Sequence, residues 1–217
     1  NRDHIHRFPN GIDVLRYAKK AQRGAFPGFV KREGEIVVGT IAGLRAVKNL
    51  PRLVRAVAAA GPNVRLAIAG EGPEKGAIIA EAERLGIADR LMLPGFLRDP
   101  SRFVGLFDIF ALSSDSEQFP ISLIEAMAAG CAVAATDVGD IRSMVSTENR
   151  RFITAKDDDN ALAGAIAELA GNDGLRSELG KANYAMALAE YGEGEMFARY
   201  RQLYGTVMRR ADFARQN

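Results

Sequence analysis

Residues 113–130 read S-S-D-S-E-Q-F-P-I-S-L-I-E-A-M-A-A-G, and this stretch predicts both the fold and the site. It follows an apolar run that ends at Leu112, which is typical of a buried strand. Pro120 predicts the start of a helix, because its fixed φ suits a first turn in which its missing N–H is not needed. Gly130 predicts the end of that helix, at a position that favours a left-handed residue. We therefore expect a strand, a polar loop and a helix, in that order.

Two carboxylates flank the start of this helix. Glu117 lies in the loop before it, and Glu125 lies one turn inside, on the same face as Ile121 and Ser122. The first N–H groups of a helix have no partner within the helix and attract anions. Side chains on a helix also lean toward its N-terminus. A phosphate at this position with hydroxyl groups on either side would fit a sugar nucleotide.

Strand and helix patterns alternate along the chain on both sides of this stretch. Apolar runs predict strands at 36–41, 65–69, 91–93, 108–112, 132–135 and 151–154. Helical spacing predicts helices between them, including a short one over 99–106, and more helices after Lys156. The alternation predicts an α/β fold, with a Rossmann-like doubly wound parallel sheet of about six strands and additional C-terminal helices. Ligands bind such sheets beyond the carboxyl ends of the strands, so we expect the site at loops 42–49, 70–73, 94–98, 113–119 and 136–140.

Composition excludes several classes of protein. The 217 residues are 47% hydrophobic and 26% charged, which is ordinary for a globular chain. A net charge of +2 gives no broad basic field, so we expect no nucleic-acid partner. The single cysteine, Cys131, excludes a disulfide scaffold, and its position between a helix and an apolar strand favours a small buried residue. No apolar run approaches the length of a membrane span, and no signal peptide is evident.

The stretch around the two carboxylates resembles a known family. Seven residues separate Glu117 from Glu125, and E-x7-E followed by A-M-A-A-G is similar to the signature of the retaining glycosyltransferases of family 4, or group 1. P-N-G-I-D at 9–13 is similar to the hinge that enters the C-terminal domain in that family. The resemblance covers residues 8–205. It implies the donor-binding domain of a two-domain GT-B enzyme, a hexosyltransferase of polysaccharide or glycolipid biosynthesis that retains the anomeric configuration.

The resemblance also implies roles for individual residues. Glu117 would contact the donor sugar, and Glu125 would hold the ribose hydroxyls. The family motif R-L-x-x-x-K-[GN] is matched at Lys48, but its arginine position holds Gly43, and Arg45 two residues later would have to reach the same phosphates. The expected catalytic residues are thus Glu117, Lys48 and Arg45, and the expected nucleotide-binding residues are Gly43, Ile121, Ser122, Leu123 and Glu125. The family generally needs no bound metal, so we expect no cofactor.

Four other patterns point to different chemistry and are weaker. In G-E-G-P-E-K-G at 70–76 the third glycine is one place late for a dinucleotide fingerprint, and the next strand ends without the acidic residue that the fingerprint needs. D-S-E at 115–117 nearly matches the D-x-D motif of metal-dependent glycosyltransferases, but we favour a sugar contact for Glu117. His4 and His6 have no partner ligands nearby in the sequence, and the three aspartates at 157–159 favour helix capping over a metal site.

We expect three segments: a hinge and mobile connector at 1–34, a nucleotide-sugar-binding domain at 35–191, and a C-terminal helix and tail at 192–217. The last helix carries a wide apolar face, which either folds onto this domain or self-associates with another chain; its members are Met196, Phe197, Tyr200, Leu203, Tyr204 and Val207. We expect the family's N-terminal acceptor domain to be missing from this chain. We therefore expect the chain alone to bind the donor without transferring it, in the cytoplasm, with any membrane attachment made through the missing domain.

Two alternatives stay open at this stage. One is a nucleotide-sugar-binding module without catalysis of its own. The other is a sugar-nucleotide epimerase on the same fold, which would need a second set of acid–base carboxylates that the sequence does not show.

Overall fold

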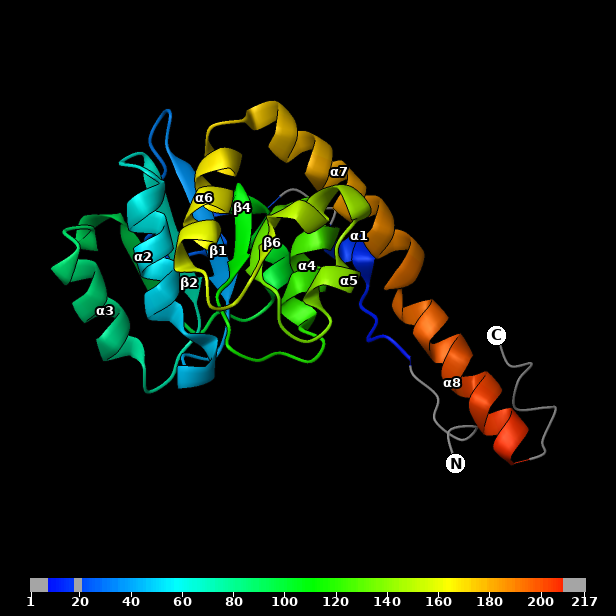
Figure 1. Ribbon diagram of the computed structural model, residues 1–217. Helices are drawn as coiled ribbons and strands as arrows, with labels where there is room; N and C mark the ends of the chain where they lie inside the picture. The colour runs from blue at the N-terminus through cyan, green and yellow to red at the C-terminus, as the bar shows by residue number, and fades with distance from the viewer. Residues whose placement is uncertain (1–7, 18–20, 209–217) are drawn as a thin grey trace.

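The computed structural model describes residues 8–17 and 21–208, and its centre is one parallel sheet (Figure 1). The sheet has six strands in the order β3-β2-β1-β4-β5-β6. Their bounds are β1 Ile36–Ile41, β2 Val64–Ala69, β3 Leu91–Gly95, β4 Ile109–Leu112, β5 Ala132–Thr136 and β6 Ile153–Thr154. Every pairing between neighbouring strands is parallel. The predicted α/β fold and its six strands are confirmed.

Helices cover both faces of the sheet. One face buries an apolar cluster under α2 (Leu50–Ala60), α3 (Lys75–Arg84) and α6 (Asp159–Ala170). The other face packs against α1 (Val14–Tyr17), α4 (Ile121–Ala128), α5 (Ile141–Met144) and α7 (Asp173–Glu190). Figure 1 shows these two groups of helices on opposite sides of the strands. Strand β4 is buried along its whole length, which is why its sequence, I-F-A-L, is a continuous apolar run.

The order of the strands reverses direction at β1. The chain passes from β1 outward through β2 to β3, then returns to β4 on the other side of β1. β1 pairs with β2 over six residues but with β4 only at Val38↔Ile109 and Gly39↔Phe110. The carboxyl ends of β1 and β4 thus mark the topological switch point, where sheets of this type bind ligands.

The ends of the helices agree with the sequence at two places. Gly130 follows α4 with φ of 75°, as expected for a residue that ends a helix. Asp158 is the N-cap of α6 and its side chain accepts a hydrogen bond from the Ala161 N–H at 2.8 Å, so capping is confirmed for this aspartate. Asp159 instead accepts hydrogen bonds from Arg52 and Arg55. The helix expected over 99–106 is wrong in type: two short 3₁₀ turns, η5 (Pro100–Arg102) and η6 (Val104–Leu106), form instead.

The N-terminal connector is more closely packed than we expected. Val14 and Phe26 are 3% and 1% exposed. The Phe26 ring meets those of Phe103 and Phe107 edge to face, with centroids 5.8 and 6.0 Å apart. Val14 and Phe26 belong to the core of the domain because they bury apolar surface against it, so the idea of a mobile connector over 14–34 is wrong for these residues. His4 and His6 lie outside the described residues.

The last helix, α8 (Glu193–Val207), extends away from the sheet beyond α7 (Figure 1). Much of its apolar face is uncovered: Phe197 is 50% exposed, Tyr204 51% and Val207 70%. Tyr200 meets Phe8 with ring centroids 5.0 Å apart. Ile12 forms a parallel bridge with Gly192, so the start of the described chain runs beside the junction of α7 and α8. The expected apolar face is present, but it does not fold onto the sheet.

Within the described ranges, no helix has the length and apolarity needed to cross a lipid bilayer. Cys131 is buried, as expected, and burial raises the pKa of its thiol to about 12.

Candidate donor site at the switch point

Lys48 and Glu117 come together across the switch point. Lys48 ends the 3₁₀ turn η3 (Ala46–Lys48) that follows β1, and Glu117 lies in the loop that follows β4. The Lys48 Nζ donates to Glu117 Oε1 at 2.6 Å, and the Ser114 hydroxyl donates to the same oxygen at 2.7 Å. The two charged side chains are 17% and 8% exposed. Two residues predicted to act at one site, 69 positions apart, are therefore in direct contact.

The loop that carries Glu117 is hydrogen-bonded to the end of β5 and to the loop after it. The Thr136 hydroxyl donates to the Ser114 carbonyl at 2.7 Å, and the Asp140 N–H donates to the Gln118 carbonyl at 3.1 Å. Gly139 has φ of 58°, and a Cβ there would lie 2.1 Å from the Glu117 carbonyl oxygen. Only glycine fits this close approach, so the position of the Glu117 backbone is set by packing as well as by hydrogen bonds.

The near match to a D-x-D motif is divided between two cations. Asp115 Oδ1 accepts from Arg52 Nη1 at 2.7 Å, and Arg52 Nε donates to Asp159 at 2.8 Å. Glu117 pairs instead with Lys48. Among the described residues, no three His, Cys, Asp or Glu side chains are grouped in a way that could hold a metal ion.

The 70–73 turn presses against the loop after β1. A Cβ on Gly70, at φ of 151°, would lie 1.8 Å from the Ala42 carbonyl oxygen. The Leu44 N–H donates to the Glu71 carbonyl at 2.9 Å, and the Glu74 N–H donates to the Leu44 carbonyl at 3.0 Å. The glycines are needed for this contact between two backbones.

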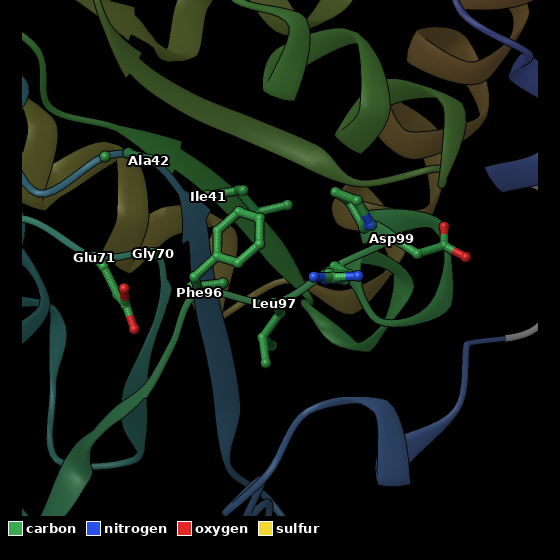
Figure 2. Close-up of a pocket in the computed structure, with 11 residues that line it drawn as sticks. Ile41, Ala42, Gly70, Glu71, Phe96, Leu97 and Asp99 are labelled. Atoms are coloured by element: carbon green, nitrogen blue, oxygen red, sulfur yellow. The ribbon is translucent and has the colours of Figure 1, made fainter.

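A pocket of about 490 Å³ opens beside these loops (Figure 2). Its lining comes from the carboxyl ends of β1 and β2 and from the loop after β3: Ile41, Ala42, Gly43, Ala69, Gly70, Glu71, Phe96, Leu97, Arg98, Asp99 and Pro100. Phe96 is 66% exposed, and Glu71 and Asp99 lie on opposite sides of its ring in Figure 2. Of the residues predicted for the site, Gly43 belongs to this lining, whereas Lys48 and Glu117 do not.

Arg45 lies against the position of the missing arginine. Its side chain is exposed, and its Nε lies 3.6 Å from where a Cβ on Gly43 would stand. The Arg45 guanidinium is thus within van der Waals contact of a side chain that would begin at Gly43. Arg45 therefore lies beside the position of the missing arginine, and its contact with the donor phosphates stays a prediction.

The N-terminus of α4 faces the same edge of the sheet, with Pro120 as its N-cap. Of the three first-turn residues predicted as ligands, Leu123 donates its N–H to the Pro120 carbonyl at 3.2 Å, so a ligand would have to compete for this group. No side chain of the described residues caps the helix. Ile121 is 49% exposed and Ser122 half-buried, which leaves their side accessible.

Glu125 has a partner that the sequence did not reveal. The Tyr17 hydroxyl donates to Glu125 Oε1 at 2.7 Å. Burial raises the pKa of Glu125, the nearby Asp99 charge adds to this, and the hydrogen bond from Tyr17 opposes it. Burial and the same hydrogen bond raise the pKa of Tyr17. No local pattern signals a contact between residues 108 positions apart.

The sheet order, the switch point and the loops around it define one Rossmann-like half of a GT-B glycosyltransferase. The chain is similar to HepE from Anabaena, solved in complex with UDP, with a TM-score of 0.80 and 21% identity over 90% of this chain and 56% of that one. It superposes on the C-terminal domain of LpcC from Francisella tularensis with a TM-score of 0.71 and 19% identity, over 84% of this chain and 99% of that domain. These likenesses show the fold.

The sequence gives the family. The family model described as glycosyl transferases group 1 matches residues 23–186, and the chain belongs to this family. It is 31% identical over 191 residues to the D-inositol 3-phosphate glycosyltransferase of Nocardia farcinica, covering 81% of this chain and 42% of the relative. It is 25% identical over 202 residues to the N-acetyl-alpha-D-glucosaminyl L-malate synthase of Bacillus anthracis, covering 92% of this chain and 53% of the relative. The chain thus spans about half the length of the curated relatives it matches.

Proposed function

We propose that this chain binds the nucleoside diphosphate sugar donor of a retaining glycosyltransferase. The observation that carries the proposal is the Lys48–Glu117 pair, with 2.6 Å between Nζ and Oε1, at the switch point. An apolar pocket lies at the carboxyl ends of β1 and β2, on the same edge of the sheet. A cation for a diphosphate, a carboxylate for sugar hydroxyls and a cavity for a nucleobase then follow one another along a single edge of the sheet.

The base would occupy the pocket at the ends of β1 and β2. The exposed Phe96 ring offers a face for stacking, and the lining is mostly apolar with a few charged groups at its rim. The ribose would lie toward Glu125, whose carboxylate accepts hydrogen bonds from hydroxyl groups.

The diphosphate would lie along the loop from Gly43 to Lys48, facing the start of α4. Lys48 and Arg45 would supply positive charge, and the N–H groups near Ser122 would add partial positive charge from the helix terminus. Charge develops on the leaving diphosphate as the bond to the sugar breaks, and groups fixed in advance around it would stabilise that charge. We propose that these groups suffice without a metal ion, so binding should persist in excess EDTA.

The sugar would lie at Glu117. Donation from Lys48 and Ser114 fixes one carboxylate oxygen, so the other is presented to sugar hydroxyls in a defined direction. In the complete enzyme, the acceptor would come from a second domain facing this edge, and we propose that the part of the curated relatives beyond this chain's match provides it.

Binding of nucleoside diphosphates tests the proposal. Uridine, guanosine and adenosine diphosphates are added separately to the chain, with the matching nucleosides as controls. A ligand at about a hundred times its Kd adds roughly 2.7 kcal/mol to the stability of the folded chain, which raises Tm by about 5–10 °C. No shift with any of the three at millimolar concentration would contradict the proposal.

The division of labour between domains has its own test. The 217-residue chain is assayed with nucleotide sugars and lipid or saccharide acceptors beside a longer form that restores upstream sequence. We expect transfer by the longer form only, because closure of two facing domains excludes water from the reaction. Robust transfer by the short chain would refute the need for a second domain.

A further inference from the structure

The short helix α1 touches the donor site on two sides. It is four residues long, begins one residue after the P-N-G-I-D segment and packs against α4. Tyr17 donates to Glu125 on α4. Arg16 donates from Nη2 to Asp99 Oδ2 at 2.8 Å and from Nε to the Ser101 hydroxyl at 3.2 Å. Asp99 belongs to the lining of the pocket, so two neighbouring residues reach two different parts of the site.

The contact of Tyr17 leaves half of the carboxylate available. Glu125 Oε1 accepts the hydrogen bond from the Tyr17 hydroxyl, whereas Oε2 accepts none from the described residues. A carboxylate can accept several hydrogen bonds on its two oxygens, but its plane rotates freely unless one of them is held. With Oε1 fixed to a half-buried phenol, Oε2 has one preferred orientation.

We propose that Tyr17 is the positioning residue for Glu125, holding one carboxylate oxygen so that the other is directed at the ribose hydroxyls of the donor. This inference rests on the proposed function, because it assumes that a nucleotide occupies the site. The inference adds to the site a residue that lies outside the sheet-edge loops. It also gives the Tyr17 hydroxyl a role that a phenylalanine at this position could not fill.

Packing around α1 supports this role. Val14 is 3% exposed and anchors the helix in the core. The salt bridge of Arg16 ties the same turn to Asp99, whose φ of 58° is rare for a residue other than glycine and marks a constrained loop. The phenol is therefore delivered to Glu125 by a fixed turn.

A double-mutant cycle between Tyr17 and Glu125 tests the proposal. Tyr17→Phe, Glu125→Gln and the double variant are titrated by calorimetry with uridine, guanosine or adenosine diphosphate, whichever the wild-type chain binds tightest. The same nucleotide without its 2′- or 3′-hydroxyl is titrated in parallel. We expect Tyr17→Phe to weaken binding about 3- to 10-fold, the effect of one lost hydrogen bond, and to lower the preference for the intact ribose. In the Glu125→Gln background the same substitution should change the affinity less than twofold, because the two residues act together.

Tyr191→Phe is the matched control. Its hydroxyl is buried and donates to the Met144 carbonyl at 3.1 Å, so its loss tests the general effect of removing a hydrogen-bonded phenol hydroxyl. Melting temperatures are measured for every variant, and titrations are done well below each of them. If Tyr17→Phe did not fold, Glu125→Gln alone would still decide whether this carboxylate distinguishes ribose from deoxyribose, and no change in that preference would overturn the inference.

Each result has a defined meaning. No binding of any diphosphate by the wild-type chain refutes the proposed function, whatever Tyr17 does. Binding by the wild type with unchanged affinity in Tyr17→Phe refutes the positioning role alone. Tighter binding by Tyr17→Phe would mean that the phenol competes with the ribose, and an equal loss for ribose and deoxyribose forms would mean that it supports only the fold. Either result overturns the inference.

Discussion

Replacing Lys48 with alanine should separate binding of the diphosphate from binding of the nucleoside. The Lys48 Nζ lies 2.6 Å from Glu117 Oε1 and is the cation at the switch point. A hydrogen bond to a charged group contributes about 1.5–3 kcal/mol. Loss of one such contact to a phosphate should therefore raise the Kd for a nucleoside diphosphate about 10- to 150-fold. The nucleoside has no phosphate, so its affinity should change by less than about twofold.

The same substitution should also lower stability by a smaller amount. Glu117 is 8% exposed and would keep the Ser114 hydroxyl but lose its cation. Breaking a fully buried pair costs about 3–5 kcal/mol, and surface pairs contribute about 0–1. Because Lys48 is 17% exposed, we expect about 1–2 kcal/mol, or a fall in Tm of about 2–8 °C.

Calorimetry with both ligands, at a temperature where wild type and variant are folded, measures these effects. Lys181→Ala, an exposed lysine of α7, is the control for loss of one positive charge. Equal losses for diphosphate and nucleoside, or a diphosphate affinity within twofold of the wild type, would refute the role of Lys48 as a phosphate ligand.

Three further outcomes are expected. Arg45→Ala should weaken diphosphate binding about 3- to 10-fold, and adding Gly43→Arg should restore it, because among the described residues only Arg45 comes within 4 Å of a Cβ at Gly43, leaving room for the new side chain. Titration of the single and double variants measures this, and no recovery would place the second cation elsewhere. Burial raises the pKa of Glu125 above its ordinary 4.5, so just above pH 4.5 the folded chain holds a proton that the unfolded chain has released. As the pH rises through this window, denaturant titrations should show the wild type losing stability relative to Glu125→Gln. A difference in stability that stays constant with pH would show that this carboxylate titrates normally. Gly70→Ala should lower stability by about 1–3 kcal/mol, because the new Cβ would lie 1.8 Å from the Ala42 carbonyl oxygen. Its control, Gly76→Ala in α3, has open space and an ordinary φ and should be neutral or stabilising. Equal melting temperatures for the two variants would argue against the close approach.

The strands were predictable because their chemistry is local. Buried parallel strands must be apolar on both faces, so the runs at β1 and β5 indicate their own positions. Gly130 and Asp158 likewise mark helix ends through their own backbone preferences and side chains. Even the meeting of Lys48 with Glu117 could be expected at the level of the sheet edge, because the carboxyl ends of parallel strands lie together.

Other features depend on distant contacts that no local pattern encodes. Phe26 lies among glycine and proline residues, which is typical of a linker. Its ring nevertheless packs against Phe103 and Phe107, which are distant in the sequence. The Tyr17–Glu125 hydrogen bond joins residues whose spacing has no period. In the segment 99–106, the apolar side chains predicted a helix, but Asp99 adopts a left-handed φ and the chain forms two separate 3₁₀ turns.

At the bridge between Ile12 and Gly192, the chain enters and leaves the domain at the same place. The Ile12 N–H donates to the Tyr191 carbonyl and the Glu193 N–H donates to the Ile12 carbonyl, both at 2.9 Å. The segments that enter and leave the domain are therefore hydrogen-bonded to each other at one point. A unit whose entrance and exit coincide can be transplanted between host chains without stretching either junction. Chimeras that exchange residues 12–192 between group 1 relatives should therefore preserve the backbone geometry at both junctions. The Ile12–Gly192 bridge is thus a suitable boundary for exchanging donor-binding domains.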